Sequence, residues 1–344
     1  MTATSPHASS PEVTVRPRRP DDEGAIIDLL QTCFPSWRDC EPRERFRWKH
    51  DRSPFGQSQC ALAESGGRLV GFIAWMPWRA VLDGRVYPAW RGVDLAVHPS
   101  VQRRGIYQRM RAYRAQCPEE QDLSFNHRNE RSEGALRKAG FASGSRIAQH
   151  VAPLWPHRAG LWYLAGRAAP SRETRLRSVA DALADEAGIE DLISRSQPEG
   201  RLATDRSLEY LRWRYGQYPG RTYLAETLRE TDGRLRGLLV GRYIAPVARR
   251  RPPGFEVSEV IVPEADRHGL RRLLRRVWRT DAAYATVVAP VPLRGRAEAW
   301  VAGFPVRREF ARFGAWALRD AAELPADLGS PRRWMIPLGD LEAL

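Results

Sequence analysis

Residues 93–110 read VDLAVHPSVQRRGIYQRM, and this stretch determines which fold we expect for the chain. It predicts a buried strand over residues 93–97, a basic loop with one glycine, and a helix over residues 106–115. Such a loop can direct several backbone N–H groups at one point, where the helix N-terminus adds its positive dipole end. Gly105 permits a close backbone approach or a conformation that a side chain would forbid. We therefore expect an anion site here.

The same loop resembles the coenzyme-A-binding segment of the GNAT superfamily of N-acetyltransferases, usually written Gln/Arg-x-x-Gly-x-Gly/Ala. Gln102 and Gly105 match this pattern, whereas Tyr107 stands where Gly or Ala is usual. Residues 129–141, NERSEGALRKAGF, resemble the last conserved segment of that family. An ordinary strand-to-helix turn would also explain the loop alone. Two segments in the order and spacing of the family favour a donor site over that alternative.

The length and composition of the chain set limits on its class. A chain of 344 residues is long enough for two domains. It has no apolar run long enough to span a membrane, and residues 1–11 lack the apolar segment of a signal peptide, so we expect a disordered tail there. The four cysteines form no Cys-x-x-Cys pair and the histidines are scattered. We therefore expect a cytoplasmic protein with no disulfide framework and no metal site.

The chain is strongly basic, with a formal net charge of +14. This excess predicts attraction to polyanions, which include phosphorylated cofactors, nucleic acid and acidic proteins. A basic surface without a nucleic-acid partner explains the same charge, and we favour that explanation because charge alone is nonspecific.

The sequence contains an internal repeat. FRWKHDRSPFG (residues 46–56) resembles LRWRYGQYPG (residues 211–220), with Trp48 and Trp213 at an offset of 165. Three further landmarks keep nearly the same offset and the same order, which favours a duplicated domain. These landmarks are Gly71 with Gly237, Val97 with Val262, and Gly140 with Gly303.

The repeat and the strand and helix patterns together predict an α/β fold with two GNAT-like domains. Each domain is expected to be a mixed, mostly antiparallel sheet flanked by helices. The connecting segment contains a predicted helix at residues 172–193, and the apolar end of the chain, residues 334–338, is expected to dock. The expected divisions are a tail (1–11), a donor-binding domain (12–150), a linker and helix (151–200), a degenerate second domain (201–320) and a C-terminal tail (321–344).

The second copy differs from the first at the loop. Its equivalent stretch, VPEADRHGLRR (residues 262–272), is one residue shorter between the aligned Val and Gly, and Glu264 and Asp266 place negative charge where a pyrophosphate would bind. We therefore expect one donor site, in the first copy. The following helix, residues 267–279, is rich in arginine, which indicates a solvated or acid-paired face or, as a sharper alternative, a phosphate-backbone contact.

The resemblance implies which residues hold acyl-CoA. Backbone groups of the donor strand would hold the pantetheine arm at Leu95, Ala96 and Val97. The loop would hold the pyrophosphate through Gln102, Arg103, Arg104, Gly105, Ile106 and Tyr107. Asn129 and Ser132 would also contact the arm, unless they only cap a helix.

Proton transfer needs further groups, because an amine acceptor arrives mostly protonated. Asp94, an acid on an otherwise apolar strand, is the candidate base, and a structural carboxylate paired with Arg91 or a backbone N–H is the alternative. The tyrosine that often protonates the leaving thiolate in the family is replaced here by Leu136. Ser132, Tyr107 or solvent could take that role.

Three functions are consistent with these features. The first is an N-acyltransferase that uses acyl-CoA, with acetyl-CoA as the expected donor, and a small-molecule amine. The second keeps the fold but takes an aminoacyl group from tRNA, or an acyl group from an acidic carrier protein. The third is a sensor that retains only the cofactor pocket. The sequence favours the first.

Overall fold

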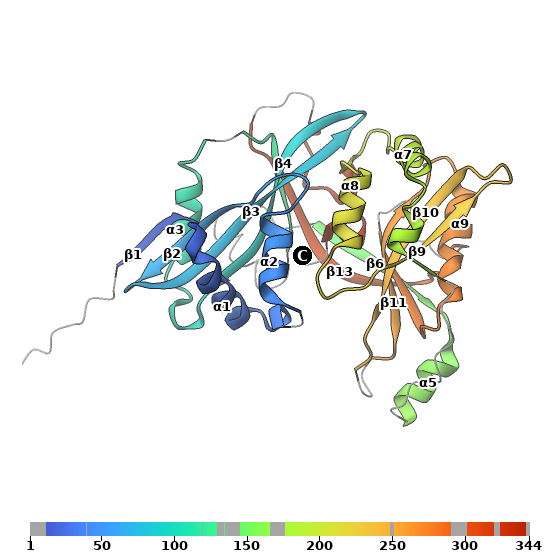
Figure 1. Cartoon of the computed structure of the whole chain (residues 1–344), viewed down its shortest axis with the longest axis horizontal. Helices are drawn as coiled ribbons and strands as arrows, with labels where there is room; N and C mark the ends of the chain where they lie inside the picture. Colours follow the sequence, from blue (N-terminus) through green and yellow to red (C-terminus); the bar gives the residue numbers. More distant parts are fainter. Residues whose placement is uncertain are drawn as a thin grey trace, which may run out of the picture.

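The computed structural model describes residues 12–38, 40–118, 120–128, 134, 145–165, 176–247, 251–289, 301–319 and 324–341. The chain forms two lobes of strands and helices that meet in the middle of the molecule (Figure 1). The first lobe contains β1 (Val13–Pro17), α1 (Glu23–Cys33), α2 (Pro42–His50), β2 (Gln59–Ser65), β3 (Arg68–Leu82), β4 (Arg85–Val97), α3 (Ile106–Arg114) and β5 (Leu123–Arg128).

The second lobe follows a connecting region of strand β6 (Ser145–Pro153) and helix α5 (Pro156–Ala165). It contains β7 (Arg177–Ser178), α6 (Val179–Ala182), α7 (Glu186–Arg195), β8 (Leu202–Thr204), α8 (Leu208–Leu211), β9 (Leu224–Arg229), β10 (Leu235–Ile244), β11 (Gly254–Ile261), α9 (Arg267–Leu274), β12 (Tyr284–Ala289) and β13 (Val306–Ala317). The chain ends with β14 (Trp334–Met335) and α11 (Leu338–Leu341).

The strands of both lobes join into one 14-stranded sheet. Its hydrogen-bonded order is β1-β2-β3-β4-β5-β13-β6-β12-β11-β10-β9-β7, with β8 and β14 beside this path. The order is symmetric about the β13–β6 pair, since each strand on one side has a counterpart at the same distance on the other. Most pairs are antiparallel, while β4–β5 and β11–β12 are parallel in the two halves. The predicted fold class is confirmed, and the sheets expected in the two domains join into one continuous sheet.

The two halves exchange their last strands. Late in the chain, β13 pairs with β5 of the first lobe, with Ala317 opposite Leu123. Strand β6, which follows β5 in sequence, pairs instead with β12 of the second lobe, with Pro153 opposite Tyr284. Both strands pass between the lobes (Figure 1). The first predicted domain, residues 12–150, thus ends within a strand that pairs with the second half.

The centre of the molecule carries a reciprocal contact between repeat landmarks. The rings of Trp48 and Trp213 stack with centroids 4.7 Å apart. The indole N–H of Trp48 donates to the carbonyl of Trp213 at 2.9 Å, and the indole N–H of Trp213 donates to the carbonyl of Trp48 at 3.0 Å. Each residue plays the same part toward the other, as expected for two copies related by an approximate twofold axis.

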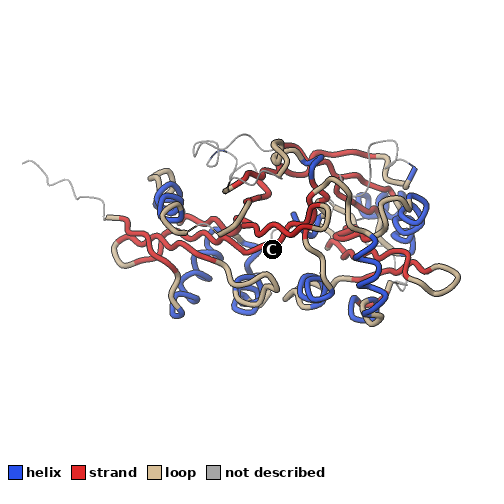
Figure 2. The backbone as a smooth tube through the Cα atoms, turned by 90° about the horizontal axis from the view of Figure 1, so that it is seen from above, coloured by secondary structure: helices blue, strands red, loops and turns tan. Residues whose placement is uncertain are grey.

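Helices cover both faces of the sheet (Figure 2). Helix α1 packs with Cys60 and Leu62 of β2, whereas α3 packs with Ala61 and Ala63 of the same strand. Because successive side chains of a strand point to opposite faces, α1 and α3 lie on opposite faces.

Two repeat glycines let the corresponding helices approach the sheet. A Cβ at Gly71 would lie 2.7 Å from Cγ2 of Ile106 in α3, and a Cβ at Gly237 would lie 3.0 Å from Cδ2 of Leu273 in α9. The alignment of these two glycines in sequence therefore reflects the same close packing in both halves.

Some predicted elements differ in the structure. The single helix expected at residues 172–193 is replaced, within the described residues, by β7 and two helices, α6 and α7. The arginine-rich helix is α-helical to Leu274 and continues as a 3₁₀ turn over Arg275–Arg279. The C-terminal segment docks as predicted, because Trp334, Met335, Ile336 and Leu338 are buried. Residues 1–11 lie outside the described residues.

Within the described ranges, each helix is too short or too polar to cross a membrane.

Candidate active site

Strand β4 has a bulge at the predicted donor strand. Ala74 of β3 lies opposite Val93 of β4, and Phe72 lies opposite Ala96. Two steps along β3 therefore correspond to three steps along β4. The extra residue on β4 falls at Asp94 and Leu95, and Asp94 has a φ of 52°. A bulge interrupts the ladder and leaves backbone groups unpaired with the neighbouring strand. The predicted pantetheine-binding backbone at residues 95–97 begins at this bulge.

The loop after β4 is shaped by the side chain of Gln102 and by two residues in the left-handed backbone conformation. The Gln102 side-chain amide donates to the carbonyl of Val97 at 3.1 Å, so this side chain shapes the loop from within. Arg103 has a φ of 66°, and Gly105, the N-cap of α3, has a φ of 76°. The first helical N–H groups, from Ile106 onward, have no partner within the helix. The loop thus presents the helix N-terminus that the sequence predicted.

The N-terminus of α3 is open. A Cβ built at Gly105 would meet one atom at 4.0 Å, Oε1 of Gln108. The side chains of Arg103 and Arg104 beside it are exposed, while Ile106 is buried and anchors the helix on the sheet. Positive charge, N–H groups that have no acceptor within the helix, and open space therefore coincide at this helix end, which suits an anion.

The counterpart in the second half is closed by its own carboxylate. Asp266 is the N-cap of α9, accepts from the N–H of Gly269 at 2.8 Å, and is paired with Arg236 at 2.5 Å. A Cβ at Gly269 would lie 2.1 Å from Oδ2 of Asp266. Glu264 is paired with Arg201 at 2.9 Å. The carboxylate of Asp266 therefore occupies the end of α9 at which an anionic ligand would bind.

The predicted loop length in the second half is wrong in detail. Gly105, the N-cap of α3, lies eight positions after Val97. Asp266, the N-cap of α9, lies only four positions after Val262. The second loop is thus four residues shorter, since Gly269 lies inside the first turn of α9 and is not the counterpart of Gly105.

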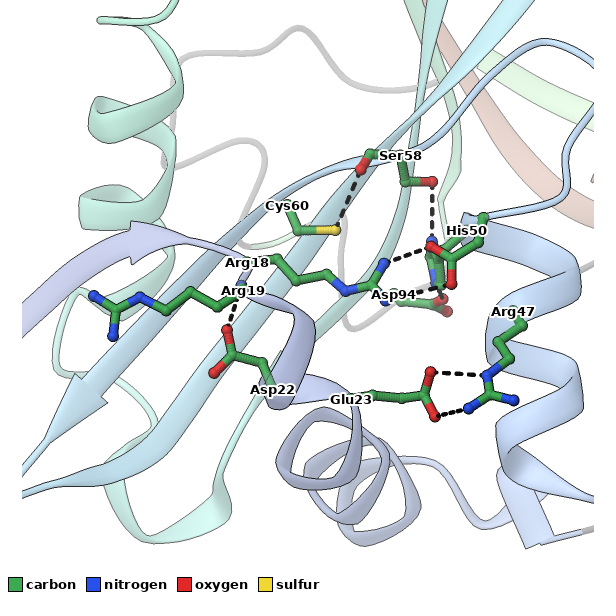
Figure 3. Close-up of polar contacts among 10 residues, drawn as sticks. Arg18, Arg19, Asp22, Glu23, Arg47, His50, Ser58, Cys60 and Asp94 are labelled. Atoms are coloured by element: carbon green, nitrogen blue, oxygen red, sulfur yellow. Dashed lines mark hydrogen bonds and ion pairs between the residues drawn. The ribbon is translucent and has the colours of Figure 1, made fainter.

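Asp94 lies in a buried cluster with two residues of α2 that the sequence did not indicate. Its Oδ2 lies 2.6 Å from Nζ of Lys49 and 3.1 Å from Nε2 of His50. The Nδ1 atom of His50 lies 3.0 Å from Oγ of Ser58. The side chains of Lys49 and His50 are 1% and 0% exposed, against 10% for Asp94. Figure 3 shows Asp94, His50 and Ser58 in line, with Arg18 alongside.

Burial and the mutual contacts determine the charges of this cluster. Burial alone would raise the pKa of Asp94, but the Lys49 ammonium and the His50 hydrogen bond hold that pKa well below its usual range. Burial lowers the pKa of Lys49 to about 8, against the opposing effect of Asp94. Burial also lowers the pKa of His50. At neutral pH the cluster therefore contains an ammonium, a carboxylate and a neutral imidazole, and Asp94 itself is a weak base.

The lowered pKa of Lys49 predicts an increase of stability with pH. Between pH 8 and the ordinary lysine value of 10.5, the unfolded chain keeps a proton that the folded protein has released, so folding gains stability as the pH rises. Wild type should gain about 2 kcal/mol relative to Lys49→Met between pH 8 and pH 10. Urea unfolding of both proteins at pH 8 and pH 10 measures the difference, in which other titrating groups cancel. A difference that stays constant or falls with pH contradicts the assignment.

The remaining candidates are placed as follows. Tyr107 is half-buried and packs against the hydrophobic cluster under α3 that includes Ile106 and Met110. Asn129 and Ser132 lie outside the described residues. Among the described residues, no three His, Cys, Asp or Glu side chains gather as a metal ion would require.

Comparison with known families identifies the first lobe. Residues 14–130 match the family described as acetyltransferase (GNAT) domain. This range covers the bulged strand, the loop and α3. The first lobe therefore contains a GNAT acetyltransferase domain. No curated protein matches the chain in sequence.

Solved structures share the fold over most of the chain. A probable N-acyltransferase from Enterococcus faecalis V583 has a TM-score of 0.61 at 13% identity, covering 89% of this chain and 72% of its own. N-myristoyltransferase from Saccharomyces cerevisiae, with bound myristoyl-CoA, has a TM-score of 0.58 at 13% identity, covering 96% and 85%. A GCN5-related N-acetyltransferase from Kribbella flavida has a TM-score of 0.52 at 12% identity, covering 91% and 71%. Both halves therefore belong to the shared fold.

Proposed function

We propose that this chain is an N-acyltransferase that transfers an acyl group, acetyl in the first instance, from acyl-CoA to the amine of a small molecule. The observation that carries the proposal is the contrast between the two helix N-termini. The one at Gly105 is open and basic, and the one at Asp266 is closed by a carboxylate. The GNAT domain at residues 14–130 supports the same reaction class.

The residues present fit the donor. The N–H groups at the start of α3, which have no acceptor within the helix, would hold the pyrophosphate together with Arg103 and Arg104, and the bulged backbone at residues 95–97 would hold the pantetheine arm. The donor brings an already activated thioester, so the protein mainly positions the reactants and handles protons.

Binding and product formation test the proposal. Acetyl-CoA should bind at one site per chain by isothermal titration calorimetry. S-acetylpantetheine, which lacks the pyrophosphate, should bind at least ~10-fold more weakly, because charged hydrogen bonds at the helix end contribute about 1.5–3 kcal/mol each. Mass spectrometry with a panel of primary amines, tyramine among them, should detect the acylated product. Absence of acetyl-CoA binding contradicts the proposal, and binding without turnover favours a sensor.

The proposal includes a cytoplasmic location. All four cysteines are free, and Cys60 is buried, which suits a reducing compartment.

One surface favours the alternative of an aminoacyl-tRNA-dependent transferase. Arg272 and Arg275 on the α9 side are exposed next to Trp278, which is 38% exposed. In contrast, Arg276 and Arg279 are paired with Glu226 at 3.7 and 3.1 Å, so much of this helix is acid-paired. Filter binding of tRNA over a salt series decides between the two. Tight binding with a steep salt dependence and no affinity for acetyl-CoA would favour tRNA. If the donor is a carrier protein, the chain should instead bind that acidic protein and should bind neither tRNA nor acetyl-CoA.

A further inference from the structure

The buried cluster beside the β4 bulge has a defined direction of hydrogen bonding. Asp94 is a carboxylate and can only accept, so Nε2 of His50 carries a proton and donates to it. The neutral ring then has a lone pair on Nδ1, and the hydroxyl of Ser58 donates to this atom at 3.0 Å. His50 is fully buried, whereas Ser58 is partly exposed. The lone pair of a buried imidazole is thus connected to the surface through one hydroxyl.

Three charged groups act on this imidazole, whereas β3 contributes the apolar ring of Phe72. Asp94 comes from β4 and Lys49 from α2 itself. Arg18, after β1, contributes a repulsion that lowers the pKa of His50, although it is paired with Asp51 at 2.6 Å. The Cys60 thiol of β2 stays protonated, because burial raises its pKa to about 12. Asp94 is therefore the group that would stabilise an imidazolium at His50.

The second half contains a corresponding cluster made of different residues. Adding 165 to Lys49, His50, Ser58 and Asp94 gives Arg214, Tyr215, Tyr223 and Glu259. One contact is also repeated, because the Tyr215 hydroxyl lies 3.3 Å from Oε2 of Glu259, as His50 lies beside Asp94. The others differ, since Glu259 is paired with Arg206 at 3.1 Å and the Tyr223 hydroxyl accepts from Arg214 at 3.1 Å. Ser58 and Tyr223 each immediately precede the first residue of a strand, β2 and β9.

This second cluster is sealed from solvent. Its four members, Arg214, Tyr215, Tyr223 and Glu259, are at most 3% exposed. The C-terminal tail lies directly on it, since the carbonyl of Gly339 accepts from Arg214 at 3.0 Å and a Cβ at Gly339 would lie 2.0 Å from the Tyr215 hydroxyl. Within one chain, the half with the open donor loop has an imidazole and a partly exposed hydroxyl in this cluster, whereas the half with the closed loop has two buried tyrosines there.

We propose that Ser58, His50 and Asp94 form the proton relay that deprotonates the acceptor amine. The acceptor ammonium gives one proton to Oγ of Ser58 while the Ser58 hydroxyl proton moves to Nδ1 of His50. The products are a free amine and an imidazolium held between Ser58 and Asp94, and the proton then returns to water by the same path. Asp94 positions His50 and stabilises its charged form, with Lys49 fixing the carboxylate. This relay rests on the proposed acyl transfer.

Kinetics with matched variants test the relay, with acetyl-CoA and tyramine as the probes. Ser58→Ala should lower kcat about 10-fold, and His50→Gln about 100-fold, with little change in the KM for acetyl-CoA, as expected for proton-transfer groups. The acid limb of the pH profile should disappear in His50→Gln. Ser58→Thr, which keeps the hydroxyl, should restore most of kcat. Tyr223→Phe removes the corresponding hydroxyl in the second half and should leave kcat unchanged.

A measurement without donor separates failure of the relay from failure of the proposed function. ¹⁵N NMR of the free protein should show His50 protonated at Nε2 and titrating below its ordinary value of 6.5. A proton on Nδ1 overturns the relay, as do wild-type kcat values and pH profiles in both Ser58→Ala and His50→Gln. If wild type neither binds acetyl-CoA nor transfers the acetyl group, the proposed function fails, and with it the role of the relay.

Discussion

Gly105→Asp should abolish the binding of acetyl-CoA while the protein stays folded. The substitution gives the open helix end of the first half the same N-cap residue that closes the second half at Asp266. A carboxylate about 4 Å from a pyrophosphate charge costs about 4 kcal/mol at an effective dielectric constant of about 20. This corresponds to about 1000-fold weaker binding. The side chain has room, because the nearest atom to a Cβ at this position lies 4.0 Å away.

Gly105→Asn is the matched control, since it has the same shape without the charge. Both side chains tolerate the left-handed conformation at a φ of 76°, at a cost of about 1 kcal/mol in stability. Calorimetry should show that Asn weakens binding ~10-fold at most, whereas Asp removes it. Equal effects of the two substitutions would mean that shape, not charge, controls this site.

The fold was predictable from local patterns, but the exchange of strands was not. The spacing of Ile26, Ile27, Leu29 and Leu30 is typical of one face of a helix, and these are the buried residues of α1. Asp83-Gly84 is a typical hairpin sequence and forms the β3–β4 turn. The partner of β5 depends on register and on contacts between residues some 190 positions apart. A periodic pattern states which face of a strand is buried, not which strand lies beside it.

The site was predictable where one contiguous stretch builds it. Residues 93–107 contain the bulge, the loop and the helix end, so the sequence located Asp94 and Gly105 together. Lys49 and His50 were missed because they belong to α2, far away in sequence, and were considered only as repeat landmarks. The signal was present in the repeat itself, since His50 and Asp94 keep the same offset from Tyr215 and Glu259 as Trp48 keeps from Trp213.

Trp213→Ala should destabilise both halves of the molecule by about 4 kcal/mol, the usual cost of removing a buried tryptophan. Trp213 is 2% exposed, stacks on Trp48 and takes part in both reciprocal hydrogen bonds at the centre. Because β13 and β6 each pair with the opposite half, neither sheet can lose its order alone. Urea unfolding followed by far-UV circular dichroism should therefore show one transition at a lower midpoint.

Trp278→Ala provides the control for this experiment, because Trp278 is 38% exposed and its edge contact with Trp155 spans 6.2 Å between ring centroids. Its loss should cost about 1 kcal/mol or less. Two separate transitions in Trp213→Ala, with the first half unaffected, would contradict a single cooperative unit. A single transition means that the two halves unfold together, so the second half, although it lacks an open helix end, contributes to the stability of the half that contains the donor loop.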